Sequence, residues 1–227
     1  MRVVALVVVA ACSGGGDDLA PDAAGPTGDA PPGLPTATEL LARIANCDVV
    51  GGPYASDDDG PVDVSICGFP GAVAWQADLD VDCDGKTTPQ CNLDTDPAYQ
   101  DQTAATDSMG DPLDAAALPY VVIPGISPRF DYRAAGLGMK SIVAVVYEDR
   151  VVYGPLGDVG PQAIIGEASY AMAEALGIDP DPSTGGVEGG VAYIAFTGDD
   201  AKLDVIEDHD AATTLGVDRA RRLLASP

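Results

Sequence analysis

Two carboxylic acids nine positions apart, Asp158 and Glu167, lie in surroundings that predict different pKa values. Asp158 lies among glycines and prolines, a composition typical of a turn, so we expect a hydrated side chain with a low pKa. Glu167 follows Ile-Ile-Gly and is expected to begin a helix on an apolar face. Burial there raises its pKa, although a helix N-terminus acts in the opposite direction. Such a pair suits glycoside hydrolysis, in which one carboxyl donates a proton and the other activates water. The alternative is that Asp158 orders a turn and Glu167 caps a helix.

Other common catalytic sets are missing from the sequence. It has no phosphate-binding loop, no dinucleotide-binding glycine fingerprint between a strand and a helix, and no nucleophile-elbow motif. His209 is the single histidine and lies in the acidic run 207–210, which is typical of a solvated loop. Acid–base chemistry therefore falls to carboxylates.

A run of alternating aspartates offers a second candidate site. Asp80, Asp82 and Asp84 match the start of a calcium-binding loop, but a cysteine stands where the closing glutamate is expected. Asp94 or Asp96 would have to replace that ligand. Three interpretations stay open: a calcium site, which is the one cofactor candidate, a subsite for the ammonium groups of a cationic ligand, and a solvated turn.

Strand geometry favours the ammonium interpretation. Asp78, Asp80 and Asp82 would share one face of a strand and present a row of negative charge along a groove. We therefore predict that Asp78 and Asp80 bind substrate. Tyr120 and Tyr153 are the aromatic candidates for stacking on sugar rings, with core packing as the alternative.

The overall charge limits the partners. The 227 residues include 36 acidic and 11 basic side chains, a formal net charge of −25. This charge repels nucleic acid and anionic membranes and attracts cationic ligands. Solubility of an exported protein is the simpler explanation of the same charge.

The N-terminus predicts export. Residues 1–11 combine one basic residue with a short apolar run, as in a signal peptide, and Val-Ala-Ala-Cys ending at Cys12 resembles a bacterial lipobox. Residues 12–35, rich in Gly, Asp, Ala and Pro, would form a tether. We expect a secreted lipoprotein at the extracellular face or in the periplasm, touching the membrane only through its lipid. An ordinary signal peptide is the alternative.

Four further cysteines are expected to form disulfides in an oxidising compartment. They are Cys47, Cys67, Cys83 and Cys91. Four cysteines allow three connectivities, and the sequence does not choose between them. Zinc is disfavoured because there is no C-x-x-C spacing and only one histidine.

Residues 36–227 are expected to form one monomeric, mainly β domain. Short β-branched and aromatic runs predict strands at 73–77, 120–123, 142–147, 151–153 and 191–196. A capping box at Thr36 and Glu39 predicts a first helix, and apolar spacing predicts helices over 168–176 and 215–224. The expected fold is a small β-barrel with a few peripheral helices.

Four blocks resemble the chitosanases of glycoside hydrolase family 75. They are residues 77–85, residues 113–124 (with a gap), residues 153–170 and residues 177–187 (with a gap), in the order that the family has them. The resemblance extends from about residue 47 to 196 and fails after Gly198. It implies inverting endo-hydrolysis of β-1,4 linkages in chitosan or partially deacetylated chitin. It also implies that Asp158 and Glu167 are the catalytic pair, and the pKa argument makes Glu167 the acid and Asp158 the base.

Residues 158–177 are also similar to a motif of rare lipoprotein A, Asp-Arg-Gly-Pro followed by Ile-Ile-Asp-Leu-Ser. That resemblance implies a six-stranded double-psi-like β-barrel with a polysaccharide groove. It supplies the alternative function, a non-catalytic glycan- or cell-wall-binding barrel lipoprotein.

Overall fold

The computed structural model describes residues 33–227. The predicted signal peptide, Cys12 and nearly all of the predicted tether lie outside the described residues. In the part that is described, no helix is both long and apolar enough to cross a membrane.

Strands dominate the order of elements along the chain. The elements are α1 (Ala37–Ile44), β1 (Asp48–Ala55), β2 (Val62–Phe69), β3 (Ala72–Asp82), β4 (Val121–Pro124), β5 (Ile142–Tyr147), β6 (Arg150–Gly160), β7 (Glu167–Ser169), α2 (Tyr170–Leu176), β8 (Val187–Phe196), a 3₁₀ turn (Asp199–Ala201) and α3 (His209–Ala225). Each of the five predicted strands lies wholly or almost wholly inside an observed one. Strands β1, β2 and β7 were not predicted.

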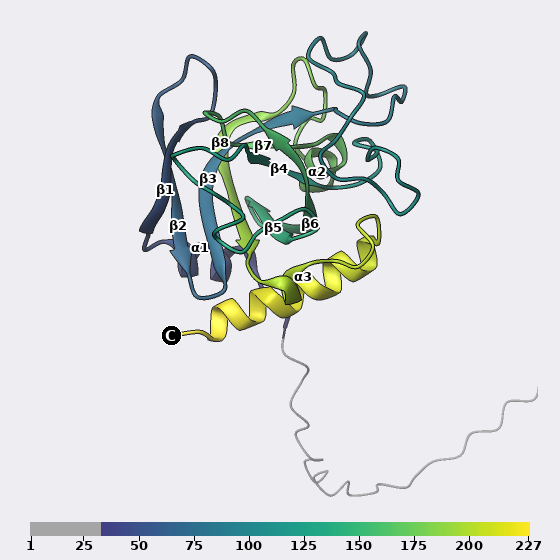
Figure 1. The fold of residues 1–227 in the computed structure, drawn as a ribbon. Helices are drawn as coiled ribbons and strands as arrows, with labels where there is room; N and C mark the ends of the chain where they lie inside the picture. Colours follow the sequence, from purple (N-terminus) through teal and green to yellow (C-terminus); the bar gives the residue numbers. More distant parts are fainter. Residues whose placement is uncertain (1–32) are drawn as a thin grey trace, which may run out of the picture. The chain divides into compact units, whose positions relative to one another are not determined.

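Within residues 33–227, six strands close into a barrel (Figure 1). Their order is β3-β7-β4-β6-β5-β8, and β8 pairs again with β3. The β3–β7 and β4–β6 pairs are parallel and the others antiparallel, so the barrel is mixed. The β1–β2 hairpin extends from the first half of β3. The predicted fold class, a mainly β six-stranded barrel with a few helices, is confirmed.

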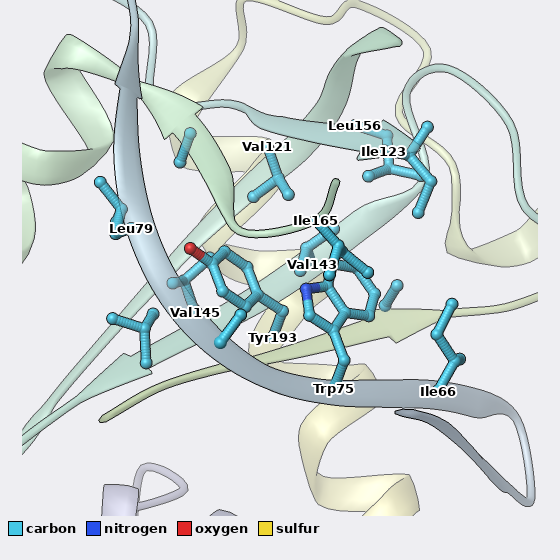
Figure 2. Packing of buried hydrophobic residues seen from close by; sticks show 14 of the residues in the cluster. Ile66, Trp75, Leu79, Val121, Ile123, Val143, Val145, Leu156, Ile165 and Tyr193 are labelled. Carbon is cyan, nitrogen blue, oxygen red and sulfur yellow. The ribbon is translucent and has the colours of Figure 1, made fainter. Parts of the chain in front are cut away.

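The barrel interior is filled by large apolar side chains (Figure 2). Trp75 on β3 and Tyr193 on β8 are register partners, and their rings stack with centroids 5.2 Å apart. Leu79, Val121 and Leu156 are fully buried around them. This packing holds the strands in one register, and the register in turn fixes where their polar residues emerge.

Helices cover one outer face of the barrel. Leu40 of α1 and Leu223 of α3 pack with Ala144 of β5 and Ile194 of β8. The predicted capping box of the first helix is confirmed: Thr36 accepts from the Glu39 N–H, and the Glu39 carboxylate accepts from the Thr36 N–H. The last helix begins at His209, six residues before the predicted start.

The stretch around Asp158 is not a turn, and the second helix does not begin at Ala168. Asp158 lies inside β6, and α2 begins at Tyr170 after a Ser169 cap. The glycines of β6 serve close packing instead of turning: a Cβ at Gly157 would overlap with the Tyr120 ring. Because strand pairing and packing override local turn preference, a Gly- and Pro-rich segment becomes a barrel strand here.

The four cysteines form two disulfides, as predicted, and the connectivity is now fixed. Cys47 pairs with Cys67 and joins the start of β1 to β2. Cys83 pairs with Cys91 and closes a short loop immediately after β3.

Candidate active site

An acidic pocket of about 560 Å³ opens over strands β3, β4, β6 and β7. Six carboxylic acids line it: Asp80, Asp82, Asp84, Asp96, Asp158 and Glu167. The predicted pair therefore faces one pocket, together with part of the aspartate run.

Strand register explains how residues far apart in sequence meet here. Asp80 on β3 is the register partner of Glu167 on β7. Val121 on β4 pairs with Ala168, which places Val122 beside Glu167, and Val122 pairs with Asp158 on β6. Asp158 and Glu167 are thus separated by one intervening strand. At a strand spacing of about 4.8 Å, their backbones lie roughly 9–10 Å apart.

Asp158 is buried and not hydrated, so the expectation of a low pKa is wrong. It is 8% exposed, and burial raises its pKa. The Ala104 and Val159 backbone N–H groups both donate to Asp158 Oδ1 at 2.7 Å, which partly offsets that rise. These two donors hold the carboxylate in a fixed orientation.

Glu167 has the raised pKa that its apolar neighbours predicted. Burial, followed by the negative charges of Asp80 and Asp158, raises its pKa to about 7. Glu167 is the first residue of strand β7 and does not begin a helix, so no helix N-terminus opposes this rise in pKa. Gly160 packs directly on the carboxyl, since a Cβ there would overlap with it.

Asp82 lines the pocket, and the buried Tyr120 lies behind it. The Tyr120 hydroxyl donates to the Asp84 carbonyl at 3.0 Å and to Asp82 Oδ2 at 3.3 Å, and the Asp84 N–H donates to Asp82 Oδ1 at 2.8 Å. Burial is the largest cause of an Asp82 pKa well above its usual range. Asp84 Oδ1 accepts from the Gln100 N–H at 2.6 Å, and burial raises its pKa to about 6.

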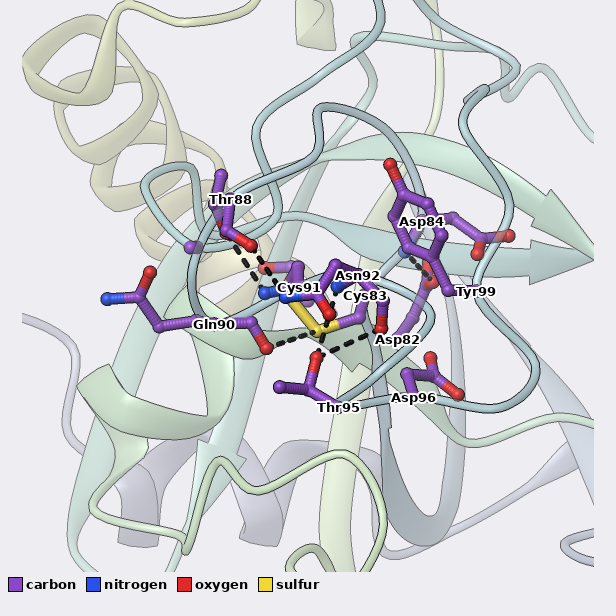
Figure 3. The surroundings of a disulfide bond; sticks show 12 residues. Asp82, Cys83, Asp84, Thr88, Gln90, Cys91, Asn92, Thr95, Asp96 and Tyr99 are labelled. Carbon is purple, nitrogen blue, oxygen red and sulfur yellow. Dashed lines mark hydrogen bonds between the residues drawn. A yellow bond between two sulfur atoms is a disulfide. The ribbon is translucent and has the colours of Figure 1, made fainter.

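The loop closed by Cys83 and Cys91 brings later residues back to the pocket. Figure 3 shows Asp82, Asp84 and Asp96 beside this bridge. Asp96 is 8% exposed and lines the pocket with Gln100. Sequence reasoning considered Asp96 only as a calcium ligand and missed Gln100. The close cysteine spacing was the one signal that the chain returns here.

Three predicted substrate-binding side chains are not free to reach the pocket. Tyr120 is 0% and Tyr153 is 6% exposed, which leaves neither ring an open face for a sugar. Tyr153 packs in the cluster beneath α3, where Gly216 fits against its ring. Asp78 is 4% exposed and lies outside the pocket lining, whereas Asp80 is exposed and lines it.

The predicted calcium loop does not form a three-carboxylate group. Oxygens of Asp82 and Asp84 already accept the hydrogen bonds described above. Within residues 33–227, the group of three acidic side chains whose oxygens converge is Asp57, Asp78 and Asp80. Asp57 was missed because it lies in the turn between β1 and β2, far from the aspartate run.

Two mostly buried carboxyls that face one pocket of a β-barrel are the kind of site that carboxylate-based glycoside hydrolases use. Comparison with known proteins is more specific. Residues 79–215 match the family described as fungal chitosanase of glycosyl hydrolase group 75, and the chain belongs to that family.

Individual relatives agree with this assignment. An endo-chitosanase of Aspergillus oryzae (strain ATCC 42149 / RIB 40) is 38% identical over 149 residues, covering 61% of each chain. An endo-chitosanase of Aspergillus fumigatus is 32% identical over 151 residues, covering 60% of this chain and 63% of that one. The chain thus spans about 61% of the length of the first of these relatives. Among solved structures, the Streptomyces papain inhibitor is 20% identical with a TM-score of 0.33, covering 56% of this chain and 98% of that one; this likeness supports no conclusion.

Proposed function

We propose that this protein is an endo-chitosanase that hydrolyses β-1,4 linkages between glucosamine units with inversion at the anomeric carbon. Family membership supports the substrate class. The observation that carries the proposal is the shared pocket of Asp158 and Glu167, on strands separated only by β4.

The surroundings of the two acids favour different roles. A pKa of about 7 keeps a large fraction of Glu167 protonated in mildly acidic solution, so it can donate a proton to the leaving glycosidic oxygen. The Asp158 carboxylate, held by two backbone N–H groups, takes a proton from water as that water attacks the anomeric carbon from the opposite face. The attack forms one C–O bond as the glycosidic C–O bond breaks, and the proton given by Glu167 ends on the leaving sugar.

The strand spacing supports inversion. Inverting glycosidases separate their carboxyls by about 6.5–9.5 Å to admit a water, while retaining enzymes bring them to about 5–5.5 Å. Two strand spacings put the backbones of Asp158 and Glu167 about 9–10 Å apart, so carboxyls on side chains that extend side by side from them would lie near the inverting distance.

Carboxylates other than the pair suit a cationic polymer. Asp80, Asp84 and Asp96 line the same pocket, and no arginine or lysine is found among the residues of 33–227 that line it. Protonated amino groups of chitosan, or of partially deacetylated chitin, would be attracted to these carboxylates. Each such contact is weak in water, but contacts along a polymer add.

The cellular location belongs to the same proposal. Two disulfides support export to an oxidising compartment. Anchoring by a lipid on Cys12 stays a prediction, as does the monomeric state. If it is correct, Cys12→Ala will release soluble, active protein or leave an uncleaved precursor. Wild-type protein in the medium with an unmodified N-terminus would refute the anchor.

Product stereochemistry tests the function directly. Chitosan oligomers should be cut internally with new reducing ends, and NMR of the first products should show the α-anomer. First products in the β-anomer would contradict inversion while retaining the activity. No release of reducing ends, with binding intact, would favour the alternative of a non-catalytic glycan-binding barrel.

A further inference from the structure

Three carboxylates converge beside the pocket from two separate segments. Asp57 lies in the turn between β1 and β2, while Asp78 and Asp80 lie on β3. One carboxylate oxygen from each lies within 4.8 Å of the other two. Asp57 and Asp80 are exposed and Asp78 is buried, so the group extends from the surface into the protein.

Asp78 supplies an independent indication of a missing partner. Its side chain is 4% exposed, and its Oδ1 is buried without any hydrogen-bond partner. The backbone of Gly166 packs against this oxygen so closely that a Cβ there would overlap with it. A buried, charged carboxylate oxygen without a hydrogen-bond partner lowers the stability of the fold. Native proteins normally pair such groups or use them to coordinate a metal.

No basic side chain provides that partner in the described chain. None of the ion pairs found in residues 33–227 includes Asp57, Asp78 or Asp80. The nearby carboxylate of Glu188 adds further negative charge at Asp80. Mutual repulsion therefore opposes the fully charged arrangement, and either a cation between the carboxylates or a proton on Asp78, whose pKa burial raises to about 7, relieves it.

We propose that Asp57, Asp78 and Asp80 bind one divalent cation, with calcium preferred. Calcium takes oxygen ligands at 2.3–2.6 Å, so two ligands on opposite sides of one ion are about 4.6–5.2 Å apart, which accommodates the observed group. Zinc prefers nitrogen and sulfur ligands, and the group offers neither.

A small ion fits the site better than the amino group of a sugar. Asp78 does not line the substrate pocket, and its Oδ1 has almost no accessible surface. An amine attached to a sugar ring would need open space at that atom, whereas a bare ion needs only the gap between the oxygens. The ion would join the β1–β2 turn to β3 beside Gly166, the residue that precedes Glu167. It would act as a structural clamp beside the active site.

The test measures thermal stability of the full chain, so it does not depend on whether the proposed hydrolysis is correct. After EDTA treatment, calcium chloride should raise the Tm in a saturable way, by about 5–10 °C at a free calcium concentration 100-fold above Kd. Sodium chloride of equal ionic strength should not. A wild-type Tm that calcium does not raise beyond the salt control would overturn the proposal.

Two variants on one turn give a matched comparison. Asp57→Asn should abolish most of the calcium-dependent rise, while Asp58→Asn, the same charge change on the adjacent exposed residue, should retain it. Equal loss in both variants, or in neither, would refute the site. Asp78→Asn provides a second check: it should be at least as stable as wild type in EDTA, because it removes an unpaired buried charge, and it should not respond to calcium.

Terbium gives a readout of binding itself. Tyr193 donates a hydrogen bond to the Asp78 carbonyl at 2.8 Å, so its ring lies close enough to sensitise terbium luminescence. Excitation of the aromatic side chains should give saturable emission that calcium displaces. Asp57→Asn should lose this emission, and Asp58→Asn and Asp158→Asn should keep it. Emission that is unchanged in Asp57→Asn would place the ion elsewhere.

Discussion

From Ala72 to Ala77, strand β3 is hydrogen-bonded to β8 and, at its start, to β2, and its side chains are apolar except for Gln76. From Asp78 to Asp82 the same strand carries three aspartates, and its last three residues, Asp80 to Asp82, pair with β7. The first half contributes burial, centred on the stacked Trp75 ring. The second half concentrates negative charge, and the pKa of each of its three carboxyls is raised, mainly by burial. One strand thus contributes to stability in one half and to the acidic pocket, at a cost in stability, in the other.

The largest expected effect is loss of turnover at the acidic pocket, which the second half of β3 helps to line. Glu167→Gln and Asp158→Asn should each lower kcat by about 10²- to 10⁴-fold without loss of fold, because each removes proton transfer. A substrate with a good leaving group should rescue Glu167→Gln but not Asp158→Asn, since only the acid assists departure. Asp149→Asn, an exposed charge in the β5–β6 turn, is the control. Near-normal kcat in either variant would reduce that residue to a structural role.

The apolar half should respond in stability. Trp75→Ala removes a ring that is 2% exposed and should cost about 3–5 kcal/mol in the free energy of unfolding, measured in urea. Gln76→Ala, on the adjacent exposed residue, should stay within about 0.5 kcal/mol. The cost at Trp75 should be the same at pH 5 and pH 8, because no titrating group is removed. A strongly pH-dependent cost would mean that the two halves are not separate.

The acidic pocket should make stability depend on pH. Folding raises the pKa of Glu167 to about 7 and that of Asp84 to about 6, so between pH 4.5 and 7 the folded state binds more protons than the unfolded state. Stability should therefore fall as pH rises through this window. Urea unfolding in EDTA should show the decline, and Glu167→Gln should reduce its slope whereas Trp75→Ala should not. Stability that rises from pH 5 to pH 7 would contradict these shifts.

The smallest expected effect concerns substrate affinity. Asp80→Asn should raise KM for chitosan by roughly 1.4- to 5-fold, the range for one exposed charge contact. Because it also removes a charge that raises the pKa of Glu167, kcat is compared at the pH optimum of each enzyme, where it should change little. KM of the wild type should also rise with salt, because exposed charges are screened over about 10 Å at 0.1 M. Both assays belong in EDTA, so that a cation at Asp80 does not contribute. If KM does not change with salt concentration or with the acetylation of the substrate, the negative charge serves solubility alone.

Much of the apolar half of β3 could be predicted from the local sequence pattern. The run 73–77 predicted its strand, because it contains β-branched and aromatic residues and is preceded by glycine and proline, a pattern that favours a strand. Strand β7 could not be predicted from the sequence. It has only three residues, and it forms because β3 and β4 provide hydrogen-bonding partners on either side. Disulfide formation was predicted from export and an even cysteine count, but the connectivity required the fold.

The candidate site was likewise predicted only in part from the sequence. Asp158 and Glu167 were selected from the sequence by residue type, spacing and resemblance, and the raised pKa of Glu167 followed from its apolar neighbours. The surroundings of Asp158 were misjudged, because its glycines allow close packing of strands as readily as a turn. Tyr153 does not stack on a sugar ring as predicted, because it is buried beneath α3, a helix that begins more than fifty residues later in the chain.

The sequence by itself determined which chemical groups this protein has and where most of its strands lie, and it selected carboxylates as the candidates for its chemistry. These properties are local, since they depend on side-chain identity and on periods of two to four residues. Tertiary structure alone decided that Glu167 lies beside Asp80, that Asp158 faces it across β4, and that Asp57 joins Asp78. Register, burial and pKa depend on neighbours distant in the chain, because barrel closure sets which strands pair and desolvation follows from what covers each carboxyl.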